Sequence, residues 1–307
     1  SDPTCQQTSC SEQKNLNQIQ LSCLTVAVRF LPNLNSTRRT ILLSTWGLFT
    51  GLALLLVTAG VYSTLVGIRA ELKQLPTLVS GGITTAYYAG FLLGSWYTLR
   101  ALKQVGHIRV YAALASLLSA SVLITGVYDS PLIWIIMRSS TGFCFAGLYV
   151  VAESWLNGLA SNTFRGRLLA MYNVVTIGAY GAGQLLVFNF DARTLTGFAF
   201  AAVVSSLAVI PVVMSEQAAT PNVDNHTHIT MRELAKIVPT GAGTILLVGL
   251  AHGGMLGMAV IYATREGLGV GRVGILIAAI NLGGMALTWP ISSASDDLDR
   301  RIIGVLS

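Results

Sequence analysis

The chain has 307 residues, of which 53% are hydrophobic and 10% are charged, and its formal net charge is +6. Because a soluble globular protein carries about a quarter charged residues, this composition argues against an ordinary soluble enzyme, a disordered chain and a coiled coil. It indicates a polytopic membrane protein.

Eight long apolar segments follow one another along the chain. A helix needs roughly 20 apolar residues to cross the hydrocarbon core of a bilayer. Backbone groups in lipid must be hydrogen-bonded within their own segment, which favours helices. The segments are residues 41–68, 76–99, 110–128, 131–158, 168–190, 194–214, 237–263 and 273–293. We therefore expect an all-α transmembrane helical bundle.

The connections between these segments predict how the chain is divided. Residues 1–39 form a polar tail, 40–214 a six-helix transmembrane bundle, 215–236 a polar linker, and 237–307 two further helices with a polar loop. A long linker after the sixth span is typical of transporters built from two six-helix bundles. On this interpretation eight of twelve helices are present, and we expect the second bundle to be truncated.

Basic residues are concentrated near one set of segment ends. Those ends carry Arg29, Arg38, Arg39, Arg100, Lys103, Arg109, Arg165, Arg167, Arg232, Lys236, Arg300 and Arg301, whereas the opposite loops carry Arg69, Lys73, Arg193, Arg265 and Arg272. The positive-inside rule then predicts a cytoplasmic amino terminus and linker. The same bias explains the net positive charge without nucleic acid. We expect no nucleotide partner, because no G-x-x-x-x-G-K-[S/T] motif is present, and no cofactor or metal.

Two loops that follow even-numbered segments have related sequences. The loop from Leu99 to Arg109 has Lys103, Gly106 and Arg109, and the loop from Ser292 to Arg301 has Asp296, Arg300 and Arg301. They resemble the repeated signature G-x-L-a-D-r-x-G-R-R of the major facilitator superfamily. The second loop keeps the acid and the basic pair, while in the first loop Lys103 stands where the family has the acid.

The fourth segment adds two further similarities to the same family. Arg138 and Gly142 match its R-x-x-x-G motif, and Tyr149, Glu153 and the pair Arg165-Gly166 resemble an aromatic–acid–RG pattern. The stretch RGRLLAMY and Trp289-Pro290 look most like a branch of uncharacterised bacterial permeases. The resemblance implies a non-enzymatic secondary transporter in the bacterial plasma (inner) membrane. Its partners would be lipid, a small-molecule substrate and H+, with two bundles rocking in alternating access.

Two ionisable residues, Arg138 and Glu153, lie within the predicted spans. A charge at such depth needs a partner or a water-filled cavity. Arg138 could bind an anionic substrate group, modulate a proton site, or lock the bundle by hydrogen bonds. Glu153 lies 15 positions further along, about 22 Å away, which predicts pairing with basic residues at the cytoplasmic end.

The resemblance also implies a central cavity, for which polar residues inside the spans are the candidates. The candidate cavity residues are Arg138, Tyr149, Gln184, His252 and Asn281. His252 could change protonation near neutral pH or form an interhelical hydrogen bond. The candidate cytoplasmic gate consists of Lys103, Arg109, Glu153, Arg165, Arg167, Asp296, Arg300 and Arg301.

Two other functions remain open from the sequence. A membrane enzyme would need His, Asp or Glu residues concentrated near one membrane face. A truncated non-transporting protein, such as a scaffold, a regulatory half-transporter or a pseudogene product, would lack half of the cavity.

Overall fold

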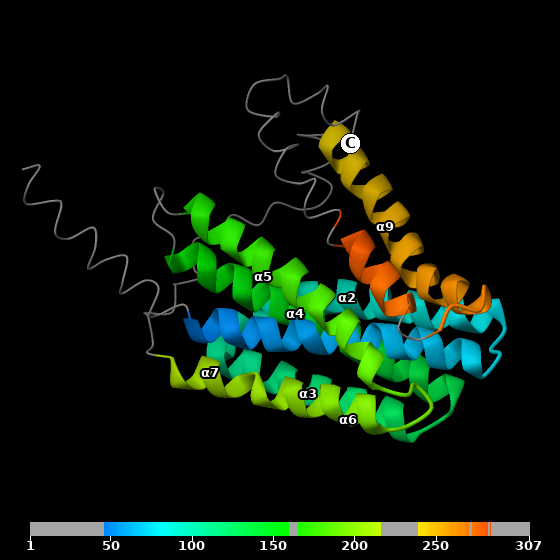
Figure 1. Cartoon of the computed structure of the whole chain (residues 1–307). Helices are drawn as coiled ribbons and strands as arrows, with labels where there is room; N and C mark the ends of the chain where they lie inside the picture. The colour runs from blue at the N-terminus through cyan, green and yellow to red at the C-terminus, as the bar shows by residue number, and fades with distance from the viewer. Residues whose placement is uncertain (1–45, 160–164, 216–238, 270–271, 282, 284–307) are drawn as a thin grey trace, which may run out of the picture. The chain divides into compact units, whose positions relative to one another are not determined.

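The structure is a computed structural model that describes residues 46–159, 165–215, 239–269, 272–281 and 283. The predicted tail, almost all of the linker and the last predicted loop, with Asp296, Arg300 and Arg301, lie outside these residues. The described elements are helices, which confirms the all-α class (Figure 1).

Each of the eight predicted segments contains a helix within the part that the structure describes. The helices are the first helix Trp46–Leu72, α2 Thr77–Val105, α3 His107–Val127, α4 Pro131–Leu159, α5 Arg165–Leu186, η1 Val187–Asn189, α6 Thr196–Leu207, α7 Val209–Met214, α9 Pro239–Arg265 and a helix Arg272–Asn281. The complete number of membrane spans remains a prediction.

Five of the described helices are long and apolar enough to cross a membrane. They are the first helix, α3, most of α4, the pair α6 and α7 taken together, and the second half of α9. Helices α2 and α5 have 29 and 22 residues, which is also long enough. Their composition is more polar, because glycine, serine, threonine and tyrosine recur along them. Such residues suit helices that pack closely or border a polar cavity.

Several helix boundaries differ from the sequence prediction, and two of the differences have a clear local cause. The segment from Arg100 to Val105, expected to be a loop, is the end of α2, and α3 begins only two residues later at His107. Gly106 makes this turn with a positive φ of 88°, a conformation that glycine adopts at little cost. The predicted sixth span is divided between α6 and α7, because Pro211 has no N–H to bond the carbonyl of Leu207.

The first helix is joined to several others by polar side chains. Thr58 donates a hydrogen bond to the carbonyl of Ala201 in α6, and the Tyr62 hydroxyl shares one of 3.1 Å with Thr125 of α3. The core around them is apolar and includes the fully buried side chains of Tyr62, Tyr111, Trp134, Trp155 and Phe198. Helix α2 packs mainly on α4, and α3 packs on α4 and α6.

Candidate functional site

A cavity of about 430 Å³ lies among the first helix, α2, α4 and α5. Its walls are largely aromatic, and its aromatic lining consists of Tyr62, Tyr87, Tyr88, Phe91, Phe145, Tyr149 and Tyr180. Several of these rings touch one another, with centroids 5.3 Å apart for Tyr87 and Tyr88 and 6.3 Å apart for Phe91 and Tyr149. The cavity therefore combines apolar ring faces with hydroxyl groups.

Among the described residues that line this cavity, Arg138 is the charged one. It lies seven residues after the start of α4, or about 10 Å along the helix. Its Cζ atom is 4.9 Å from the ring centroid of Tyr62 and 5.3 Å from that of Tyr87, distances at which cation–π attraction operates. Its buried Nε has no hydrogen-bond partner in the described part of the chain.

Close packing of two helix backbones positions Arg138. A Cβ on Gly90 of α2 would collide with the carbonyl of Ser139, the residue next to Arg138. A Cβ on Gly142 would collide in the same way with the carbonyl of Tyr87. The two glycines thus let α2 and α4 approach until Tyr87 lies against the guanidinium group.

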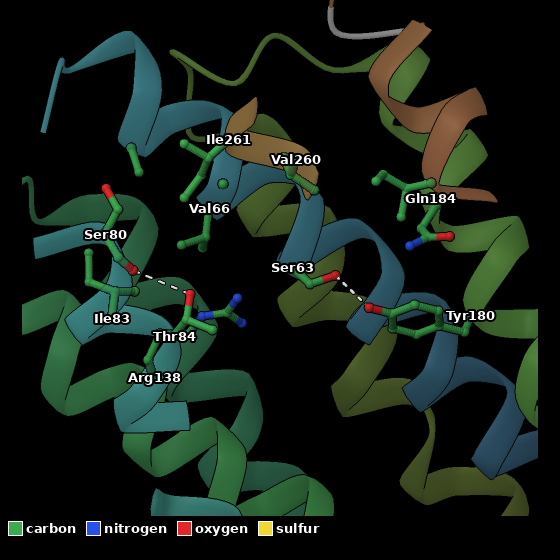
Figure 2. A pocket seen from close by; sticks show the side chains of 13 residues that line it. Ser63, Val66, Ser80, Ile83, Thr84, Arg138, Tyr180, Gln184, Val260 and Ile261 are labelled. Atoms are coloured by element: carbon green, nitrogen blue, oxygen red, sulfur yellow. Dashed lines mark hydrogen bonds between the residues drawn. The ribbon is translucent and has the colours of Figure 1, made fainter. Parts of the chain in front are cut away.

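A second, smaller cavity of about 50 Å³ adjoins the same arginine. Figure 2 shows Arg138 beside Thr84 on one side and the pair Ser63 and Tyr180 on the other. The hydroxyl groups of Ser63 and Tyr180 are 3.0 Å apart and share a hydrogen bond. Three helices thus bring hydroxyl groups to the space around the guanidinium group.

The structure distributes the predicted cavity residues over these two spaces. Arg138, Tyr149 and Asn281 line the larger cavity, and Arg138 and Gln184 line the smaller one. The Asn281 amide nitrogen donates a 3.2 Å hydrogen bond to the side-chain oxygen of Gln184, which joins α5 to the helix Arg272–Asn281. His252 belongs to α9, and its side chain lies outside the described residues.

The predicted gate residues are described only in part. Glu153 is exposed, and the hydroxyl group of Tyr172 in α5 donates a 3.0 Å hydrogen bond to its Oε1. Lys103 and Arg109 are exposed near Gly106. The side chains of Arg165 and Arg167, at the start of α5, lie outside the described residues.

The opposite ends of the helices carry ion pairs that the sequence did not predict. Arg265, the last residue of α9, donates from Nε to both carboxylate oxygens of Glu71 at 3.0 and 3.1 Å. Asp129 accepts from Arg69 at 2.9 Å and from Lys73 at 3.0 Å. Glu71 and Arg265 are 194 residues apart in sequence, so no local pattern indicates this pair.

Sequence reasoning also missed the contribution of α2 to the cavity. Thr84, Tyr87, Tyr88 and Phe91 all line it. They recur at positions i, i+3, i+4 and i+7, the spacing of one helix face. A polar and aromatic stripe at this spacing could have indicated the cavity wall.

No protein-family model matches the chain. Among curated proteins, it is similar to the uncharacterised MFS-type transporter YcaD of Escherichia fergusonii, with 25% identity over 260 residues, covering 83% of this chain and 67% of the relative. YcaD proteins of Escherichia coli are 25% identical over 262 residues and 24% over 258, with the same coverage. These relatives confirm the resemblance to major facilitator permeases. Together with the apolar helices, they identify an integral membrane protein.

Proposed function

We propose that this permease-like chain carries a small solute across the bacterial inner membrane by secondary active transport. The observation that carries the proposal is the 430 Å³ cavity around Arg138, because a cavity of this size suits a small ligand. The names of the YcaD relatives support a transporter. A charged residue deep in a membrane protein is itself typical of a solute or ion path.

Alternating access requires contacts that can form and break between the two predicted bundles. The Glu71–Arg265 pair joins the first helix to α9, helices that belong to different predicted bundles. Near this pair, Gly67 packs against Val260 of α9. In the proposed topology these residues lie on the outer side, so the pair would hold the outer side closed.

The energy of this pair suits a reversible contact. The Arg265 side chain is 46% exposed and that of Glu71 is 16% exposed. Solvent screens such a pair, which limits its contribution to about 1 kcal/mol or less. A contact of this strength can bias the closed state and still open in each transport cycle.

Coupling to protons is the finer part of the proposal. Glu153 is an acid within α4 and accepts its hydrogen bond from Tyr172 of the neighbouring α5. Neutralisation of this carboxylate would weaken this hydrogen bond between α4 and α5 without removing it, because a charged acceptor makes the stronger bond. In this proposal a proton gradient favours one of the two transport conformations. The amino terminus of the chain lies in the cytoplasm.

Uptake into proteoliposomes tests the proposed function. The purified chain is reconstituted and exposed to a defined mixture of small metabolites, with and without a pH gradient, and luminal contents are measured by mass spectrometry. Transport predicts that at least one solute is enriched over protein-free liposomes, and proton coupling predicts a larger enrichment with the gradient. Equal contents in both preparations would contradict transport and favour the non-transporting alternative.

A further inference from the structure

We propose that the substrate is a small organic monoanion whose carboxylate binds Arg138 and whose apolar body lies against the tyrosines of the cavity. This inference rests on the proposed transport function and names the substrate class of the same site. Charge, hydrogen-bonding capacity and the shape of the walls each support it.

The charge of Arg138 has no acidic partner among the described residues. Glu71 pairs with Arg265, and Asp129 pairs with Arg69 and Lys73. Glu153 is 15 positions further along the same helix, about 22 Å away. An unpaired cation at this depth is unfavourable in a membrane, and an anionic ligand would neutralise it.

The hydrogen-bonding capacity of Arg138 is also available. Its contacts with the rings of Tyr62 and Tyr87 are cation–π contacts, which orient the guanidinium group without using its N–H donors. A guanidinium fork matches a carboxylate through two parallel hydrogen bonds. The orphaned Nε is one of the donors that such a ligand would satisfy.

The remaining walls indicate an organic rather than an inorganic anion. Arg138 stands among Tyr87, Phe91, Tyr149 and Tyr180 in a cavity of about 430 Å³. Ring faces bury apolar ligand surface favourably, whereas a hydrated inorganic anion would gain little from them. A single arginine balances a single negative charge, which favours a monoanion over a dianion.

Ligand-induced stabilisation of the purified chain tests the inference directly. The thermal midpoint of the chain in detergent is measured with benzoate and phenylacetate, with their neutral amides benzamide and phenylacetamide, and with benzylamine. The proposal predicts that the carboxylates raise the midpoint at concentrations at which the amides and the amine do not. Equal effects of carboxylates and amides, a preference for benzylamine, or no effect of any carboxylate would each overturn the proposal.

Variants assign the carboxylate preference to Arg138. Arg138→Gln should abolish it, whereas Arg138→Lys keeps the charge but loses the fork, and loss of one charge-assisted hydrogen bond should weaken binding about 10-fold. Arg193→Gln, which removes an exposed arginine outside the cavity, should leave the preference unchanged. A carboxylate preference that persists in Arg138→Gln would overturn the assignment. If Arg138→Gln does not fold, the ligand-induced shift of the thermal midpoint in Arg138→Lys is compared with that of the wild type, and equal shifts would overturn the assignment.

The two proposals fail in different ways. Uptake of solutes without any carboxylate preference would refute the substrate class and leave transport standing. Carboxylate binding at Arg138 without uptake into proteoliposomes would refute transport and leave the anion site standing.

Discussion

Two arginines within the described helices have contrasting surroundings. Arg69 is 6% exposed and is fully engaged, because it donates to the carbonyl of Gly126 at 3.0 Å, pairs with Asp129 at 2.9 Å, and has its Cζ 5.1 Å from the ring centroid of Phe198. Arg138 instead has ring contacts and an unpartnered Nε. These surroundings indicate that Arg69 stabilises the fold, and they support the proposal that Arg138 binds a ligand.

Arg69→Gln should therefore destabilise the protein without affecting the cavity. Loss of the charge-assisted hydrogen bonds costs about 1–3 kcal/mol, and we expect the lower part of this range because Asp129 is 47% exposed. The thermal midpoint in detergent should fall by several degrees, while Arg193→Gln should leave it unchanged. A midpoint equal to that of the wild type would show that Arg69 contributes nothing.

Glu153→Gln separates the charge of this residue from its hydrogen bond. The glutamine oxygen can still accept the bond from Tyr172, so only the charge is lost. If the charge holds the proposed cytoplasmic gate closed, labelling of a cavity cysteine from the cytoplasmic side should rise. Unchanged labelling would refute the gate assignment of Glu153.

At the scale of helices, contact between α2 and α4 determines the geometry of the cavity. Gly90, Gly94 and Gly142 each bring a backbone of one helix against a carbonyl of the other. Small residues at this spacing drive helix association in membranes, where burial of apolar surface provides little attraction. The aromatic wall on α2 therefore depends on glycines that line no part of the cavity themselves.

Two substitutions on α2 test this dependence. Gly90→Ala should destabilise the protein by about 1–3 kcal/mol, because the new Cβ would meet the carbonyl of Ser139. Gly82→Ala is a matched control in the same helix, since nothing lies within 4 Å of its Cβ position, and it should be neutral or stabilising by up to about 1 kcal/mol. Thermal midpoints measured in detergent compare the two, and equal effects would contradict the packing role of Gly90.

The sequence predicted the positions of the helices far better than the side-chain contacts between them. Apolar length sufficed to locate the segments. The pairing of Glu71 with Arg265, and of Gln184 with Asn281, joins residues distant in the chain, and no local pattern encodes it. The sequence did not predict that α2 continues to Val105, because charged residues that follow an apolar segment were taken to mark the end of the helix.

At the scale of the whole molecule, the described helices carry different contacts at their two ends. One end has the ion pairs of Glu71 with Arg265 and of Asp129 with Arg69 and Lys73. Near the other end, Glu153 accepts a hydrogen bond from a tyrosine. In the proposed topology the ion-paired end is the outer one, and we propose that the state with these pairs formed is closed on that side, with access to the cavity around Arg138 from the cytoplasm.

The most direct test measures from which side a cavity cysteine reacts. Thr84→Cys is made in a background without the four native cysteines. It is exposed to a membrane-impermeant thiol reagent in right-side-out and in inverted vesicles. Thr85→Cys, which lies on a different surface of α2, is the control. We predict reaction of Thr84→Cys mainly from the cytoplasmic side. Adding Arg265→Gln should raise reaction from the outer side about 2–5-fold, as expected for loss of a pair worth up to about 1 kcal/mol. Equal reaction from both sides, or no response to Arg265→Gln, would contradict alternating access through this cavity.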